Sequence, residues 1–226
     1  MATTTDKGYS VASLEDLSTA PSFSPGGNDD GRERLDVRNH FGITSFGING
    51  VRIPGAGMLV REHDELAALA SSAQEELYIV LGGSATFTLD GEELEAPAGT
   101  LVYVRPEVKR SAVAADEGTT LLIVGGTPGQ AYDPTPPEAA EAFAAYNAGD
   151  YEKAADKQQL ALEKKPDSLL VLFNAACFEA RSGRTDDAIE HLQRAVEIDE
   201  RVKENIRTDE DLESLREDPR FEALTK

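Results

Sequence analysis

Residues 75–113, EELYIVLGGSATFTLDGEELEAPAGTLVYVRPEVKRSAV, decide the fold of the first part of this chain. Within this stretch, apolar and polar residues alternate over 84–89, SATFTL, so we expect a strand with one buried face. The pair Asp90-Gly91 follows directly and supplies the positive-φ geometry of a tight hairpin turn. The stretch therefore predicts antiparallel β-structure built from hairpins.

Similar short pieces extend from about residue 41 to residue 126. They are rich in β-branched and aromatic residues and separated by turn residues, a rhythm typical of an all-β barrel or sandwich. The piece at 101–104, LVYV, is apolar on both sides, so we expect it in the interior of a sheet. We assign residues 35–130 to this β domain.

Composition and charge restrict the function classes. The formal net charge of −20 repels phosphate backbones and anionic lipid headgroups, so neither nucleic acid nor a membrane is expected as a partner. The single cysteine, Cys177, has no internal disulfide partner, and we expect a buried thiol. The N-terminus lacks the features of a secretion signal, so the expected location is the cytoplasm.

Residues 1–34 are rich in Thr, Ser, Asp and Gly and poor in large apolar groups, which predicts a disordered tail. A short interaction motif around Leu14 and Leu17 is a minor alternative for part of this segment.

The quoted stretch resembles the cupin family, over roughly residues 43–126. The order of acidic residue, apolar strand, glycine turn, strand, Asp-Gly hairpin, Pro-x-Gly turn and closing strand is similar to the corresponding stretch of that family. The resemblance implies a double-stranded β-helix, or jelly-roll barrel. It also implies a homodimer, because cupin barrels frequently pair through their sheets.

Metal-binding members of that family hold the ion with three histidines and one glutamate, a set that suits divalent transition metals. This chain has only His40, His63 and His191, and His191 falls in the helical half. A three-histidine barrel site is therefore excluded, and we expect neither a resident metal nor another cofactor.

The resemblance places individual residues at the family's ligand positions. His63 matches one of the paired histidines, with Arg61 or Glu65 in the other place, and Glu76 matches the glutamate. Arg110 stands where the third histidine would be, and a guanidinium cannot ligate a cation because it stays protonated. It could instead pair with Glu76 or attract an anionic ligand.

Three interpretations of the barrel mouth stay open: a structural Arg110–Glu76 ion pair, a site for a small anion, or an atypical metal centre of His63, Glu65 and Glu76. We expect no catalytic residue. The candidate ligand-binding residues are His63, Glu65, Glu76, Tyr78, Tyr103 and Arg110.

After a linker at 131–137, residues 138–226 are rich in Ala, Glu, Leu and Lys, and two helices are predicted at 138–148 and 152–164. The pattern returns 34 positions later: Ala142, Gly149, Ala154, Ala161 and Leu162 are echoed by Ala176, Gly183, Ala188, Ala195 and Val196. That period resembles the tetratricopeptide repeat, which implies helical hairpins with a peptide-binding groove. The resemblance makes Asn174 and Phe178 candidate groove residues.

Two repeats leave apolar ends uncovered, so we expect the C-terminal segment to act as a cap. Thr208 is its predicted helix N-cap, Leu212 and Leu215 share one face, and Phe221 and Leu224 follow beyond the break at Pro219. Taken together, the sequence predicts two domains, an all-β jelly roll followed by all-α hairpins. We interpret the chain as a non-enzymatic binding or scaffold protein for a small ligand and a protein partner. The alternative is an isomerase or dioxygenase-like cupin enzyme with a reduced or metal-free site around His63, Glu76 and Arg110.

Overall fold

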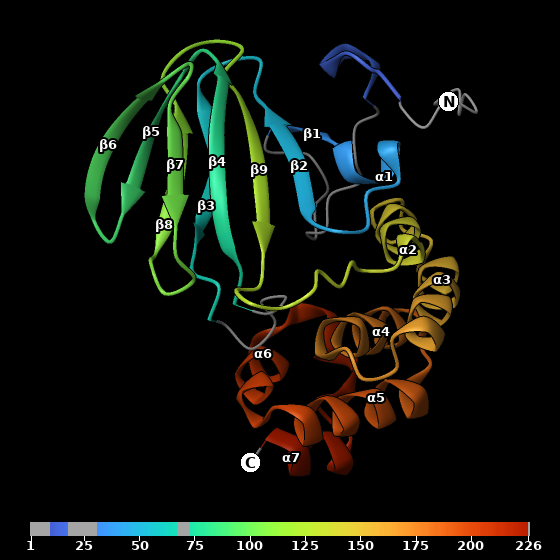
Figure 1. Ribbon diagram of the computed structural model, residues 1–226. Coiled ribbons are helices and arrows are strands. Elements are labelled where there is room, and N and C mark those ends of the chain that lie inside the picture. The colour runs from blue at the N-terminus through green and yellow to red at the C-terminus, as the bar shows by residue number, and fades with distance from the viewer. Residues whose placement is uncertain (1–9, 18–30, 67–72, 226) are drawn as a thin grey trace. The chain divides into compact units, whose positions relative to one another are not determined.

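The computed structural model describes residues 10–17, 31–66 and 73–225 (Figure 1). The described chain divides into two compact units between Pro134 and Thr135. The first is built of strands and the second of helices. Each unit is considered by itself below.

The β unit consists of two antiparallel sheets (Figure 1). The five-stranded sheet has the order β1 (Glu33–Leu35), β2 (Gly47–Arg52), β9 (Thr120–Gly126), β4 (Glu75–Gly82) and β7 (Leu101–Val104). The four-stranded sheet has the order β3 (Gly57–His63), β8 (Arg110–Ala114), β5 (Ser84–Leu89) and β6 (Glu92–Pro97). An all-β first unit is therefore confirmed.

Side chains from both sheets fill the space between them. Alternation along the strands sends Tyr78 and Val80 of β4 inward from one sheet and Ala85 and Phe87 of β5 inward from the other. The rings of Tyr78 and Phe87 meet edge to face, with centroids 5.4 Å apart. This packing closes the interior.

The β4–β5–β6 region follows the sequence closely. The hairpin between β5 and β6 turns at Asp90 and Gly91, with φ of 49° and 88°, as predicted from the Asp-Gly pair. The prediction for LVYV was wrong, because β7 is an edge strand of its sheet. Its Val102 and Val104 are buried, whereas Leu101 and Tyr103 lie on the exposed outer face.

The expected tail contains structure where it is described. Residues Leu14–Asp16 form a 3-10 turn, η1, and β1 begins at Glu33, so a disordered segment up to residue 34 is wrong for these residues. Leu17 packs with Leu35 and with Val37 of helix α1 (Val37–Phe41). Residues 1–9 and 18–30 lie outside the described part of the chain.

The helical unit begins with four helices, each packed against the next: α2 (Pro137–Asn147), α3 (Tyr151–Lys164), α4 (Leu169–Ser182) and α5 (Thr185–Ile198). The alanines at the 34-residue period are buried: Ala142, Ala154, Ala161, Ala176, Ala188 and Ala195. Gly149 and Gly183, one period apart, both adopt positive φ in the connecting turns. The assignment of these hairpins as tetratricopeptide repeats stays a prediction.

The chain then continues through η2 (Glu200–Val202), α6 (Lys203–Thr208), η3 (Glu210–Leu215) and α7 (Pro219–Thr225). Leu212, Leu215 and Phe221 are buried, as a cap requires, whereas Leu224 is half-buried. The N-cap prediction was wrong, because Asp209 accepts the capping hydrogen bond of η3 and Thr208 ends α6. Across the described residues, we find no helix with the length and apolar character needed to span a membrane.

Gly83, in the turn between β4 and β5, offers a test of this packing. Its φ is +67°, and a Cβ there would lie 2.4 Å from Oγ1 of buried Thr119. Gly83→Ala should therefore destabilise the β unit by about 3 kcal/mol, from backbone strain and overpacking together.

Gly91→Ala is the matched control, because φ is also positive (+88°) but nothing lies within 4 Å of the added Cβ. It should cost only about 1 kcal/mol. If Gly83→Ala and Gly91→Ala lower the free energy of unfolding equally in chemical denaturation, the close approach of residue 83 to Thr119 is contradicted.

Candidate functional site

The two sheets bring a group of polar side chains together at one end of the β unit. His63 ends β3 and lies opposite Arg110, the first residue of β8, in the ladder register. Glu76 and Tyr78 are two residues apart on β4, so both belong to one face of the other sheet. We call His63, Glu65, Glu76, Tyr78 and Arg110 the mouth cluster.

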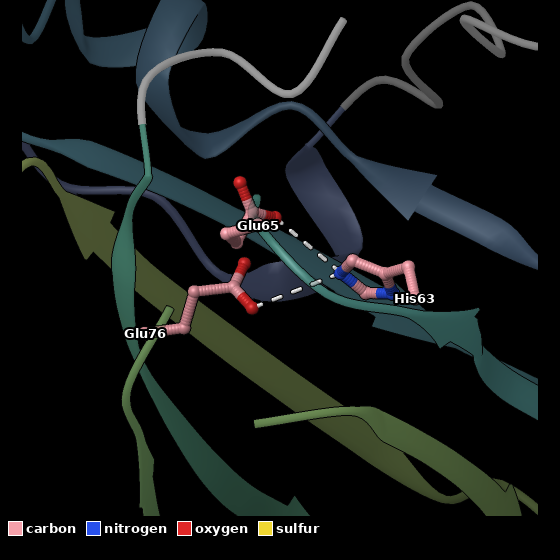
Figure 2. Close-up of side chains that lie close together, drawn as sticks. All are labelled: His63, Glu65 and Glu76. Atoms are coloured by element: carbon pink, nitrogen blue, oxygen red, sulfur yellow. Dashed lines mark ion pairs between the residues drawn. The ribbon is translucent and has the colours of Figure 1, made fainter. Parts of the chain in front are cut away.

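Three members of the mouth cluster converge on one point (Figure 2). The Nε2 atom of His63 lies 3.4 Å from a carboxylate oxygen of Glu65 and 3.9 Å from Oε2 of Glu76. The imidazole comes from the four-stranded sheet and Glu76 from the five-stranded sheet. The contact therefore exists only when both sheets are assembled.

The orientation of the His63 ring is set by the backbone. Its Nδ1 lies 2.7 Å from the carbonyl oxygen of Arg61, which can only accept a hydrogen bond. Nδ1 therefore carries a proton, and Nε2 is directed at the carboxylates. The hydrogen bond with Glu65 raises the pKa of His63, because the carboxylate favours the imidazolium form.

Arg110 is fully buried, with 0% of its side chain exposed. Its Nη2 donates to the carbonyl oxygen of Arg105 at 3.0 Å. Its Nε is 3.6 Å from Oε2 of Glu76, an ion pair too long to be a hydrogen bond. Nε and Nη1 thus have no hydrogen-bond acceptor among the described residues.

Glu76 has a second neighbour in Tyr78, whose hydroxyl donates to Oε2 at 2.5 Å. Burial raises the pKa of Glu76, since water no longer solvates the charged carboxylate, although the Tyr78 hydrogen bond and Arg110 oppose this effect. Burial likewise raises the pKa of Tyr78, which stays a neutral donor.

Tyr103 does not join the mouth cluster. It lies on the outer face of β7, 57% exposed, and its hydroxyl donates to Glu75 at 2.6 Å. The prediction that it lines the barrel mouth was wrong, because Val102 and Val104 occupy the inward positions of that strand. The other five predicted residues are brought together.

An atypical metal centre of His63, Glu65 and Glu76 is one of the three interpretations left open by the sequence, so we compare the donor set with the needs of a metal ion. His63, Glu65 and Glu76 each offer one ligand atom, and these atoms all lie within 4.8 Å of one another. One imidazole and two carboxylates suit divalent first-row metals, and a backbone hydrogen bond on the other ring nitrogen is the usual support for a ligating histidine. The three donors fit a divalent cation, while the charge of Arg110 beside Glu76 opposes one.

In the helical unit, Phe178 packs against Phe143 and Tyr146 and is buried. It therefore cannot face a peptide in a groove, and that prediction was wrong. Asn174, on the same helix, is half-buried.

Sequence analysis missed two polar groups inside the helical unit. His191 Nδ1 lies 2.7 Å from Glu179, and both residues are buried between α4 and α5. The hydroxyl of Tyr146 donates to Asp211 of η3 at 2.6 Å. A signal existed for Glu179, since it is the one charged residue in an otherwise apolar run, 175–180.

Comparison with known proteins finds similarity to solved structures. No protein-family model and no curated protein matches the chain. A cupin protein from Bacteroides fragilis is 23% identical, with 51% of this chain and 91% of that chain covered and a TM-score of 0.37. A sugar phosphate isomerase of the cupin superfamily from Silicibacter pomeroyi is 24% identical, with 52% and 76% covered and a TM-score of 0.42.

An RmlC-like cupin from Desulfovibrio desulfuricans is 18% identical, with 42% and 79% covered and a TM-score of 0.33. The chain is similar to these cupins over about half of its length. At this distance the likeness carries no argument about function, which has to come from the mouth cluster itself.

The environment of His63 makes a testable prediction. Its pKa in the folded protein should lie above the ordinary value of about 6.5, as measured by NMR titration. Glu65→Gln should lower that pKa, because the largest cause of the shift is removed. Since the folded-state pKa is raised, His63 contributes stability below about pH 6.5 that is lost as the pH rises through the folded-state value.

Glu62→Gln is the control for this titration, because Glu62 pairs with Lys109 on the protein surface. An unchanged His63 pKa in Glu65→Gln, or an equal drop in Glu62→Gln, would contradict the assigned contact.

Proposed function

We propose that this chain is a non-catalytic binding protein, in which the mouth cluster holds a small anionic ligand and the helical unit docks a protein partner. The observation that carries the first part is Arg110, a buried guanidinium with two donor groups that meet no acceptor among the described residues. Buried polar groups nearly always have partners, and an unmet donor costs about 1–3 kcal/mol. An anionic oxygen at Nε or Nη1 would remove that cost.

The surroundings of Arg110 favour binding over turnover. Phe87 packs against Tyr78 of the cluster and has no exposed surface, and the core of the β unit that contains both rings is closed. Catalysis requires space for a substrate beside the reacting groups, whereas a small anion needs only the place of one side chain. The isomerase and dioxygenase-like alternatives therefore receive less support from this geometry.

Glu76 competes with such a ligand. Its Oε2 occupies the position nearest to Arg110 Nε, at 3.6 Å, while Tyr78 holds the same oxygen. An anion that reaches Arg110 must displace this carboxylate or lie beside it, and like charges at that distance repel. In the absence of a ligand, the Glu76 carboxylate thus supplies the negative charge next to Arg110.

The test is isothermal titration of the purified full chain with acetate, malonate, citrate and inorganic phosphate. Glu76→Gln should bind the preferred anion about tenfold more tightly, because the competing charge is removed. Arg110→Lys keeps the charge but loses the unbonded donors, and should weaken binding by about tenfold or more.

Arg105→Gln is the matched control, because its side chain is exposed while its backbone carbonyl still accepts from Arg110. It should leave the affinity unchanged. The proposal is wrong if none of the four anions binds, or if Glu76→Gln weakens binding.

The second candidate is a divalent cation at His63, Glu65 and Glu76, favoured by their spacing and by the Arg61 hydrogen bond that directs Nε2 at the carboxylates. Titration with Mn²⁺, Zn²⁺ or Ni²⁺ would then show uptake of one ion per chain. Glu76→Gln should weaken metal uptake by about tenfold or more, since a ligand is lost. This variant therefore separates the two candidates by the sign of its effect.

For the helical unit, the docking proposal rests on the half-buried Asn174 of α4, which keeps solvent contact. Phe178 is excluded from this role by its burial. Asn174→Ala should leave anion binding at the mouth cluster unchanged, because the two residues belong to different units.

A further inference from the structure

The last strand of the four-stranded sheet, β6, has one open side (Figure 1). Among the described strands it is hydrogen-bonded to β5 alone. The N–H of Ala98 donates to the carbonyl oxygen of Gly83 at 2.9 Å, and bonded pairs recur at every second residue of an antiparallel ladder. Leu94 and Ala96 therefore direct their backbone groups to β5, and the residues between and before them direct theirs to the open edge.

The residues that face the open edge are Glu93 and Glu95. Each directs one N–H donor and one C=O acceptor away from β5. Leu94 lies opposite the buried Phe87 and so belongs to the inner face, which places both glutamate side chains on the outer face. Both glutamates are exposed, and Leu94 is 44% exposed. The edge therefore offers an acidic, an apolar and an acidic residue in succession.

The carboxylates of this edge have no basic partner within the described part of the chain. Residues 62–104 contain no lysine and no arginine. Glu93 and Glu95 take part in no ion pair in the described structure, whereas the exposed Glu62 of β3 pairs with Lys109 at 2.7 Å. The open edge of β6 thus carries negative charge that its surroundings do not compensate.

This charge restricts what can pair with β6. A second copy of the strand would set glutamates opposite glutamates, and like charges directly opposite each other destabilise a sheet. Charged edge strands resist pairing with their own copies for this reason. A strand with lysine or arginine at the two opposite positions would instead gain two cross-strand ion pairs. The net charge of −20 also attracts such a cationic segment over a longer range.

We propose that β6 is a docking edge for an extended basic segment of another protein, which adds to the four-stranded sheet as an antiparallel strand. Two cationic side chains of the segment lie opposite Glu93 and Glu95, and an apolar side chain between them covers Leu94. Glu93 and Glu95 each exchange two backbone hydrogen bonds with the residue opposite. Pro97 has no N–H and ends the edge on one side, so the recognised segment is short.

The first test is a titration of the full chain with the fluorescein-labelled peptide STKVRVTS in low salt, followed by fluorescence anisotropy. Wild-type protein should bind it about tenfold more tightly than STKRVVTS, which has the same composition but places one cation on the inner face. Raising NaCl to about 0.5 M should weaken binding several-fold. Absence of binding, equal affinity for the two peptides, or affinity that salt does not change overturns the proposal.

Charge variants locate the site. The double variant Glu93→Gln/Glu95→Gln should weaken binding by about tenfold or more, because both cross-strand ion pairs are lost. The matched control is Asp116→Asn/Glu117→Gln, which removes the same charge from the exposed turn between β8 and β9. It should leave the affinity unchanged. Equal losses in the two proteins would show that net charge alone attracts the peptide, and would overturn the proposal.

The second test separates strand pairing from charge attraction. Glu95→Pro removes an N–H of the open edge that takes no part in the ladder with β5, so it should weaken binding more than Glu95→Gln, which keeps this N–H. Hydrogen exchange of the wild-type protein gives the same information without a substitution. The amides of Glu93 and Glu95 should exchange more slowly when the peptide is saturating. Unchanged exchange at both amides overturns the proposal.

Discussion

The mouth of the β unit depends on one constraint, the burial of the Arg110 charge at the end of a closely packed core. A guanidinium cannot lose its proton, so the protein must supply opposite charge or hydrogen-bond acceptors instead. Arg105 provides one acceptor through its backbone, and Glu76 provides a charge at a distance too long for a hydrogen bond. The neighbours therefore compensate the arginine only in part.

The other groups of the mouth cluster explain why the charge of Arg110 is compensated only in part. Glu76 is held by Tyr78, so it cannot move fully toward Arg110, and His63 is held by the Arg61 carbonyl with Nε2 toward the same carboxylate. Buried ion pairs contribute little net stability unless every group is satisfied. A cluster that leaves donors unmet is better suited to receiving a ligand than to stabilising the fold.

The helical unit handles a buried charge differently. Glu179 and His191 meet at 2.7 Å inside the contact between α4 and α5, so each satisfies the other directly. This pair has a structural role that the mouth cluster does not fulfil. The contrast supports the proposal that the β unit, rather than this buried pair, holds a ligand.

Sequence alone determined the local features, because these depend on neighbouring residues: the Asp90-Gly91 turn, the inward face of β5 and the 34-residue spacing of small residues in the helices. The sequence alone also excluded a three-histidine metal site, because the β part contains too few histidines. Tertiary structure alone decided that β7 lies at an edge and exposes Tyr103, and that α2 buries Phe178. Periodicity shows which residues share a face, but which element covers that face depends on contacts between residues far apart in the chain.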